Sequence, residues 1–325
     1  MINFCKLLDA STGFVERHFD PIEISDYRGR AGKVIWLDVQ DPTEEDFELL
    51  KVEFDFHHLA LDDCRQAHAR PKLEKYADYI FLVVYEVRPE RLSHRLNTVE
   101  LNIFFGANYV VTMHRGTAEV ISLVETRWET QEVGAAAEGA SYLAYLVIDA
   151  AVDSYFPILD SFSDQLEILE EGMFGDFRED VVQEIFQLKK QTLQLRRLVT
   201  PLRDVFLVLL RRDDTMFGPR TYLYFQDVLD HLLRVSDAID TYRDLVSGAV
   251  DAYMTTVSNR TNETMKQLTV TSTVLMTAAL IAGIYGMNFE AMPELKWKYG
   301  YPYALTLMLV CSLGLVALFK RKRYI

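Results

Sequence analysis

The sequence predicts an α/β amino-terminal domain, a stalk of long helices and two transmembrane helices at the carboxyl end. Three observations lead to this prediction. Residues 1–145 alternate short β-rich runs with amphipathic segments. Apolar residues then recur in heptads between residues 222 and 253, which favours a long packed helix. Finally, residues 267–289 and 299–319 contain no charged side chain, and each stretch is long enough to cross a bilayer.

The amino-terminal domain, residues 1–145, is predicted from its strands and from one capped helix. KVIWLDVQ, YIFLVVYEV and VELNIFFGANYVVTMHR are rich in β-branched and aromatic residues, as strands are. TEEDFELLKVEF opens with Thr43 and Asp46 in a capping pattern, which predicts a helix. A nearby group has side chains of metal-ligand type but matches no known metal-site spacing, so we expect scattered roles for its members: His57, His58, Asp62, Asp63, Cys64 and His68.

Composition excludes several classes of function. The net charge of −14 argues against a nucleic-acid partner, because binding phosphates requires a basic surface. No Walker A loop, nucleophile elbow, HExxH or GxGxxG motif is present, so we expect neither an enzyme nor an organic cofactor. The amino-terminal residues MINFCKLLDASTGF lack the basic start and apolar core of a signal peptide, and we expect this end to stay in the cytoplasm.

One continuous helix is predicted from Tyr222 to Gly286, because this segment lacks proline and its heptads run from Phe225 to Tyr253. At 1.5 Å per residue such a helix is roughly 100 Å long. Residues 185–209 repeat the apolar pattern and are the expected antiparallel partner, with the turn at Met216–Arg220. These helices make up the predicted cytoplasmic stalk, residues 146–266.

The membrane domain is predicted over residues 267–325. It consists of a first span at 267–286, an outer loop at 287–300, a second span at 301–319 and a basic tail at 320–325. The Lys320–Arg323 cluster favours the cytoplasmic side, so both termini are expected there. We therefore expect a multi-pass protein of the inner (plasma) membrane. Glu290 and Glu294 would place negative charge on the outer loop.

A stripe of mostly small or polar side chains follows one face of the long helix, at alternating steps of four and three residues. Its members are Asp251, Thr255, Ser258, Asn262, Met265, Thr269, Ser272, Met276, Ala279, Gly283 and Gly286. A solvated face accounts for the cytoplasmic half. Within the span two explanations stay open, namely hydroxyls bonded to their own helix at a tight helix contact or a wet pore. Two spans cannot enclose a pore, so conduction would need a ring of identical chains.

The motif YGMNF, residues 285–289, resembles the signature of the CorA family of divalent-cation channels, in which Gly-Met-Asn ends the first of two carboxyl-terminal spans. YFQDVLDH, SNRTNETMK, AGIYGMNFEAMPELKWKYGYP, the terminal KRKR and, nearer the amino end, LDDCRQAHARPKLEKYADYIFLV are also similar to family sequence. The resemblance implies a funnel-shaped homopentamer that carries Mg²⁺, and often Co²⁺ and Ni²⁺, down its electrochemical gradient. Its partners would be copies of itself, the lipid bilayer and divalent cations.

The resemblance also implies roles for individual residues. The selectivity filter would be Gly286, Met287 and Asn288. The pore lining and gate would be Met265, Leu268, Ser272, Met276, Ala279 and Gly283, although some family members carry a hydroxyl at the position of Ala279. Asp251 would lie at the cytoplasmic end of the pore. Asp63 and Asp227 match carboxylates that hold a regulatory Mg²⁺ between neighbouring subunits.

Physical arguments support part of this assignment. Mg²⁺ gives up its water reluctantly, so a ring of neutral Asn288 amides suits the hydrated ion. Met276 and Leu268 would form a hydrophobic constriction, which can close a pore by dewetting. A divalent ion gains about 4.6 kcal/mol across 100 mV, so transport needs no ATP.

Two alternatives stay open. A zinc transporter of the same architecture shares Gly-Met-Asn, although MPEL after the signature resembles the Mg²⁺ branch more. A non-conducting, membrane-anchored sensor would use the long helix as a rod and would need no pore. Ion flux distinguishes the sensor from both transporters.

Overall fold

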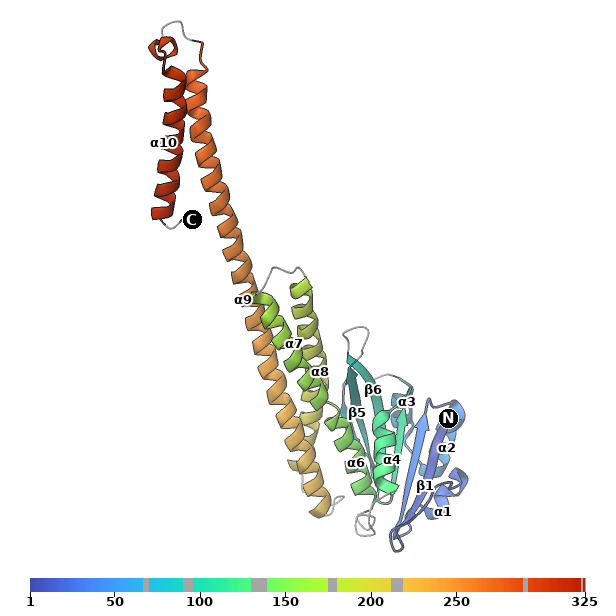
Figure 1. Cartoon of the computed structure of the whole chain (residues 1–325). Helices are drawn as coiled ribbons and strands as arrows, with labels where there is room; N and C mark the ends of the chain where they lie inside the picture. Colours follow the sequence, from blue (N-terminus) through green and yellow to red (C-terminus); the bar gives the residue numbers. More distant parts are fainter. Residues whose placement is uncertain are drawn as a thin grey trace. The chain divides into compact units, whose positions relative to one another are not determined.

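The computed structural model describes residues 1–66, 70–89, 96–129, 139–174, 180–211, 219–288, 292–322 and 324 (Figure 1). By its internal contacts the chain divides into two units, Met1–Ala249 and Val250–Ile325. The first unit holds a β-sheet with its helices. The second holds the end of one long helix and a shorter carboxyl-terminal helix.

A seven-stranded sheet forms the centre of the first unit. Its strands are β1 (Ile2–Asp9), β2 (Phe14–Glu16), β3 (Lys33–Gln40), β4 (Lys72–Lys75), β5 (Tyr79–Pro89), β6 (Leu96–Gly106) and β7 (Tyr109–His114). Their order across the sheet is β2-β1-β3-β7-β6-β5-β4. All pairings are antiparallel except that of β3 with β7. The predicted runs form β3, β5, β6 and β7.

Helices cover both faces of the sheet. The helices before β4 are η1 (Pro21–Glu23), α1 (Ile24–Tyr27), α2 (Glu44–Phe54) and α3 (His58–Arg65), and those after β7 are α4 (Glu119–Glu129) and α6 (Ala140–Asp153). Phe54 of α2 contacts Tyr109 of β7, with ring centroids 4.9 Å apart. On the other face, Trp128 of α4 contacts Trp36 of β3 at 5.5 Å. The central strands are therefore buried on both sides, which explains their nearly continuous apolar sequence.

The predicted helix cap is present at the start of α2. Thr43 accepts a hydrogen bond from the backbone N–H of Asp46, and the Asp46 carboxylate accepts one from the N–H of Thr43. Both donors belong to the first turn of the helix, where no backbone partner exists. This reciprocal pair fixes where α2 begins.

Three further helices follow, namely α7 (Phe156–Phe174), α8 (Asp180–Arg211) and α9 (Pro219–Tyr285). The helix predicted from Tyr222 to Gly286 is thus confirmed as one element of 67 residues. Its partner is α8, because Phe206 contacts Phe225 and Arg196 pairs with Asp240. Residue numbers fall along α8 as they rise along α9, so the two helices are antiparallel. Most of the predicted turn at Met216–Arg220 lies outside the described residues, and α9 begins at Pro219, a favoured first position.

The second unit consists of the end of α9, a short helix η2 (Pro293–Lys296) and α10 (Gly300–Arg321). Gly300 begins α10 at a close approach, since a Cβ there would lie 2.2 Å from the carbonyl oxygen of Glu294. Only glycine fits this contact without moving the backbone. The contact sets how the loop before α10 turns into the helix.

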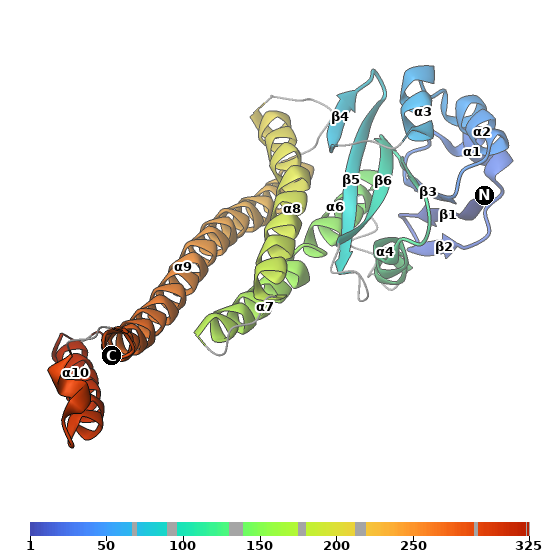
Figure 2. The same cartoon turned by 90° about the horizontal axis from the view of Figure 1, so that it is seen from above.

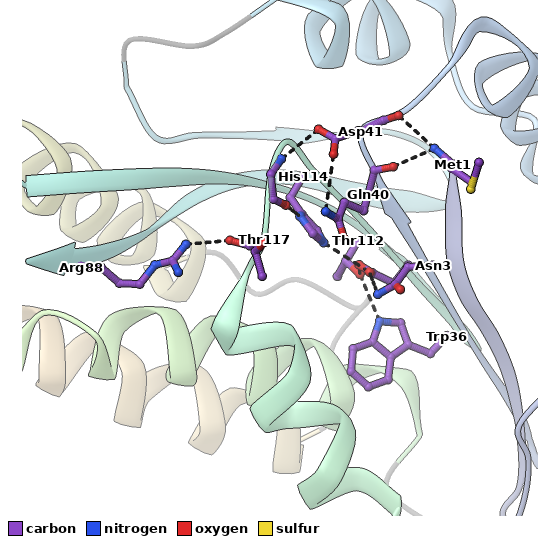
Figure 3. A network of polar contacts seen from close by, with 11 residues as sticks. Met1, Asn3, Trp36, Gln40, Asp41, Arg88, Thr112, His114 and Thr117 are labelled. Carbon is purple, nitrogen blue, oxygen red and sulfur yellow. Dashed lines mark hydrogen bonds and ion pairs between the residues drawn. The ribbon is translucent and has the colours of Figure 1, made fainter. Parts of the chain in front are cut away.

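A buried polar network joins β3 to β7 (Figure 3). The Asp38 carboxylate accepts hydrogen bonds from Thr112 at 2.5 Å and from Asn3 at 3.0 Å. The two ring nitrogens of His114 lie 3.3 Å from Asp38 Oδ2 and 2.7 Å from the carbonyl oxygen of Gly116. Both face acceptors, so the doubly protonated imidazolium satisfies the site best. Burial lowers the pKa of His114, but the hydrogen bond and charge of Asp38 outweigh burial and raise the pKa above its usual value.

We predict that this network loses strength as the pH rises above about 6.5, the pKa of an unperturbed histidine. The imidazolium contributes its full stabilisation below the unfolded pKa of about 6.5, and the contribution disappears as the pH passes the higher folded pKa. His114→Asn should therefore lower the free energy of unfolding by about 3 kcal/mol at pH 6 and by less at pH 9. Thermal unfolding of the full-length protein in detergent measures both values. An equal difference at every pH would contradict the ion pair.

Candidate functional site

An acidic cluster lies where α6 meets the first part of α9. Asp149 and Asp153 are four residues apart on α6, and Asp227 and His231 are four apart on α9, so each pair shares one helix face. Ligand atoms of Asp149, Asp227 and His231 all lie within 4.8 Å of one another. This arrangement brings together side chains that could hold a metal ion.

The cluster contains two buried polar atoms that need a partner. His231 Nδ1 lies 3.4 Å from Asp149 Oδ1 and 3.5 Å from Asp153 Oδ1, while Nε2 lies 3.9 Å from Asp227 Oδ1. Within the described residues, neither Asp149 Oδ1 nor His231 Nδ1 has a hydrogen-bond partner. Buried polar atoms rarely lack a hydrogen-bond partner in proteins. A cation bound between them would satisfy both.

The electrostatics of the cluster also favour a cation. Burial, together with the negative charges of Asp153 and Asp227, raises the pKa of Asp149 to about 6, although His231 and Arg127 act in the opposite direction. A cation would reverse this balance, because it stabilises the ionised carboxylates. Carboxylate oxygens suit Mg²⁺, and an imidazole nitrogen suits ions such as Co²⁺, Ni²⁺ and Zn²⁺. The residues present therefore fit a divalent cation.

Of the two carboxylates assigned to the regulatory site, the structure places Asp227 in this cluster and Asp63 elsewhere. Asp63 lies on α3, where it forms an ion pair with Lys72. Figures 1 and 2 show α3 and the first part of α9 on opposite sides of the sheet. A single chain therefore does not bring Asp63 and Asp227 together. Any site that uses both must combine residues from two copies of the chain.

Sequence reasoning missed Asp149 and His231. The only signal in the sequence is the helical spacing of four residues, in VIDAAVD and in DVLDH, and acidic pairs at this spacing are common on exposed helix faces. The other side chains of metal-ligand type around α3 have local partners. His57 accepts from the backbone N–H of Leu59, and the Cys64 thiol donates to the carbonyl of Ala60. His68 lies outside the described residues.

Three described helical stretches are long and apolar enough to cross a membrane: Ala140–Gly172, Thr221–Tyr285 and Gly300–Arg321. In the first stretch, 67% of the most apolar 18-residue segment is buried inside the protein. In each of the other two stretches, only 6% of the corresponding segment is buried. The first stretch therefore belongs to the core of its domain. The apolar surfaces of the other two need a covering of lipid or of further protein.

The predicted pore residues lie on an uncovered face of α9 in the second unit. Met265, Leu268 and Met276 are 56%, 59% and 71% exposed. The other predicted pore residues are exposed as well, namely Ser272, Ala279 and Gly283. In the same unit Val270 of α9 and Ala304 of α10 are buried. The two helices thus bury other faces and leave the stripe free to contact further chains or water.

Three threonine hydroxyls in this part of α9 are satisfied by their own helix. Thr269, Thr273 and Thr277 each donate a hydrogen bond to the carbonyl oxygen four residues earlier. Their oxygen atoms can still accept hydrogen bonds from water or from another helix. These bonds are therefore compatible with both explanations of the stripe, the tight helix contact and the wet pore.

The three predicted filter residues follow the end of α9. The N–H of Gly286 donates to the carbonyl of Ala282 at 2.9 Å, and the N–H of Met287 to that of Ile284 at 3.3 Å. Asn288 comes next, in exposed backbone without regular structure. Neither Gly286 nor Asn288 adopts a left-handed conformation, so the pair is not a left-handed helix cap.

The remaining charged residues assigned from the sequence lie at separate places. Asp251 is exposed on α9, and Glu294 is exposed in η2. Glu290 lies outside the described residues. Of the two acidic residues predicted for the outer loop, the structure thus places Glu294 at the surface before α10, where its charge can attract cations through solvent.

Comparison with known proteins decides the family. The profile of the family described as CorA-like Mg²⁺ transporter protein matches residues 31–321. The chain belongs to the CorA family. It is 38% identical to the cobalt/magnesium transport protein CorA of Thermotoga maritima over 84% of this chain and 78% of the relative. It is 37% identical to the putative metal ion transporter YfjQ of Bacillus subtilis over 88% of both chains.

Solved structures support the fold. The complete structure of the CorA magnesium transporter from Methanocaldococcus jannaschii matches with a TM-score of 0.84 and 24% identity, covering all of both chains. The cytoplasmic domain of ZntB from Vibrio parahaemolyticus matches 80% of this chain with a TM-score of 0.60 and 12% identity. The predicted α/β domain, long helix and carboxyl-terminal helix are confirmed as the fold of a CorA-family member.

We predict that Asp149→Asn stabilises the protein when divalent cations are absent. The change removes a negative charge that burial and the neighbouring charges of Asp153 and Asp227 disfavour. After allowance for partial exposure, this should raise the free energy of unfolding by about 1 kcal/mol. The melting temperature in EDTA should rise by a few degrees, whereas added Co²⁺ should stabilise the variant less than the wild type. Asp164→Asn, at an exposed position of α7, is the control. A variant that melts below the wild type in EDTA would contradict the repulsion.

Proposed function

We propose that this protein is a channel that passes Mg²⁺, and Co²⁺ or Ni²⁺ as well, across a membrane down its electrochemical gradient. The observation that carries the proposal is the uncovered stripe on α9, a membrane-length helix that ends at Gly-Met-Asn. A relative of 38% identity is named a cobalt/magnesium transport protein, which supports the choice of ions. Because one chain cannot enclose a pore, the conducting form is a ring of copies, and we propose a pentamer.

The filter of this channel is the ring formed by Gly286, Met287 and Asn288 from all copies. Amide oxygens of Asn288 accept hydrogen bonds from the waters of a hydrated cation, so the ion enters without losing its tightly held shell. Carboxylates in their place would bind the ion strongly and release it slowly. Glu294, in the loop before α10, raises the local concentration of cations.

Below the filter, the stripe on α9 lines the path. Met276 lies on the stripe and Leu268 lies beside it, and the rings of these two bulky side chains form the constriction that closes by dewetting. Ser272 leaves room for a hydrated ion between the two bulky rings, and Ala279 and Gly283 do so between Met276 and the filter. Asp251 marks the cytoplasmic end. The membrane potential drives the flow, since a divalent ion gains about 4.6 kcal/mol per 100 mV.

The charges at the end of α10 support the proposed orientation. Lys320 and Arg321 form its last turn and Lys322 follows directly, and such clusters remain on the cytoplasmic side. With two spans, the domain formed by the first unit lies on the same side. We therefore place the protein in the inner (plasma) membrane with both termini in the cytoplasm.

The filter is tested by Asn288→Ala. The assay uses proteoliposomes that are loaded with a Mg²⁺-sensitive dye and held at an inside-negative potential. The wild type should take up Mg²⁺, and the uptake rate of the variant should be at least about tenfold lower, because each copy loses one amide that contacts the waters of the hydrated ion. Asn259→Ala, on α9 but off the stripe, should leave uptake unchanged.

Other outcomes of the uptake assay would select another function. Uptake of Zn²⁺ without Mg²⁺ uptake or competition would identify a zinc transporter. If folded, inserted protein passed no divalent ion, the non-conducting, membrane-anchored sensor would be the remaining function. Equal Mg²⁺ uptake by the wild type and Asn288→Ala would remove Asn288 from the filter.

Regulation by cytoplasmic Mg²⁺ is the second part of the proposal. Asp63 and Asp227 lie on opposite sides of the sheet in one chain, so an ion held by both must join neighbouring copies. Asp149 would add a second carboxylate beside Asp227, and His231 could accept a hydrogen bond from a water that the Mg²⁺ ion retains. An ion bound there draws the copies together while Mg²⁺ is abundant. Its loss restores the repulsion among the carboxylates and frees the long helices to tilt.

This regulation predicts the behaviour of the double variant Asp63→Ala, Asp227→Ala. Both changes remove charged ligands of the inhibitory ion, so the cytoplasmic Mg²⁺ concentration that halves uptake should rise by about tenfold or more. Uptake at zero cytoplasmic Mg²⁺ should not fall. Asp164→Ala serves as the control for a lost surface charge. Inhibition at the wild-type concentration would remove both residues from the regulatory site.

A further inference from the structure

The hydroxyl of Tyr145, on α6, donates a hydrogen bond to the carboxylate of Asp227. The distance from the hydroxyl oxygen to Asp227 Oδ2 is 3.2 Å. The other carboxylate oxygen, Oδ1, lies 3.9 Å from His231 Nε2. The hydrogen bond therefore engages one oxygen of Asp227, while the second oxygen is turned towards the side chains that could hold a cation.

Tyr145 belongs to the same helix contact as the acidic cluster. It lies four residues before Asp149 on α6, as Asp227 lies four residues before His231 on α9, so each pair shares one helix face. Tyr145 contacts Asp227, and one turn further along both helices Asp149 contacts His231. The hydroxyl thus lies directly beside the cation-binding atoms.

The ring of Tyr145 is held by two other tyrosines. Its centroid lies 4.8 Å from that of Tyr224, with the planes 26° apart, and 5.8 Å from that of Tyr142. Tyr142 and Tyr224 also contact each other, with centroids 5.1 Å apart. Aromatic rings attract one another at such separations. The stack therefore fixes the direction in which the Tyr145 hydroxyl points.

The Tyr145 hydroxyl is a donor at neutral pH. Burial and the negative charges of Asp149 and Asp227 raise the pKa of Tyr145, which keeps its proton in place. The hydrogen bond thereby holds Asp227 Oδ2 in place when no cation is bound.

We propose that Tyr145 is a positioning residue of the regulatory cation site, whose hydroxyl holds Oδ2 of Asp227 so that Oδ1 faces the ion. The inference rests on the regulatory site proposed above. Groups that orient a metal ligand without touching the metal change the affinity by about 10- to 100-fold when they are removed. The contact is partly exposed, so we expect a change at the lower end.

Tyr145→Phe in the full-length protein tests this role, because it keeps the aromatic stack and removes only the hydroxyl. The cytoplasmic Mg²⁺ concentration that halves uptake should rise about tenfold. Uptake at zero cytoplasmic Mg²⁺ and the melting temperature in EDTA should stay at wild-type values. Tyr142→Phe removes a hydroxyl from the neighbouring ring of the same stack and should change none of the three.

Asp227→Asn, measured in parallel, separates this inference from the regulatory site itself. Unchanged inhibition in Asp227→Asn would overturn the site, and the role of Tyr145 with it. A shift in Asp227→Asn, with Tyr145→Phe within about twofold of the wild type, would overturn only the role of Tyr145. If Tyr145→Phe and Tyr142→Phe shifted the inhibitory Mg²⁺ concentration equally, the effect would belong to the aromatic stack. This result would also overturn the positioning role of Tyr145.

A measurement of stability covers the case in which Tyr145→Phe itself lowers the melting temperature. The rise in melting temperature on addition of Mg²⁺ is then compared between variants, each relative to its own value in EDTA. A smaller rise for Tyr145→Phe than for Tyr142→Phe supports the positioning role, because it reports binding and not the folding baseline. An equal rise overturns it.

Discussion

The structure depends on one constraint, the continuity of α9 over Pro219–Tyr285. In lipid every backbone N–H and C=O group must be satisfied within the protein, and a continuous helix does this without a partner. The same helix carries Asp227 near its beginning and the stripe and Gly-Met-Asn at its end. Coupling between two sites requires an element with two arrangements whose equilibrium both sites bias.

The acidic cluster supplies an energy difference that can act on such an element. Burial and like charges disfavour the ionised Asp149, and within the described residues Asp149 Oδ1 and His231 Nδ1 lie close together without a hydrogen bond to satisfy either atom. A cation bound at the proposed site would remove both costs at once and would stabilise whichever arrangement holds the cluster together. Tyr145 keeps part of the site ordered between binding events. The Asp38–His114 pair, by contrast, is satisfied within one chain and serves the stability of the domain.

The fold was predictable from the sequence because its signals are local. The capping pattern at Thr43 and Asp46 fixes the start of α2, the β-rich runs give β3, β5, β6 and β7, and the absence of proline after Tyr222 allows one long helix. The uncharged stretches predict the two carboxyl-terminal helices by length alone. Each of these features depends on residues that are close together in the chain, so periodicity and composition reveal them.

The candidate site was predictable only in part. Gly-Met-Asn and the stripe follow from helical spacing and from resemblance, and Asp227 was found through a matching motif. The partners of Asp227 were not found, because Tyr145 and Asp149 come from α6, and no local pattern shows which face of α6 meets α9. The sequence by itself determined the helices, the spans and the residues at the end of α9. Only the tertiary structure decided that Asp149, Asp227 and His231 meet and that the sheet separates Asp63 from them, since packing between distant segments sets those distances.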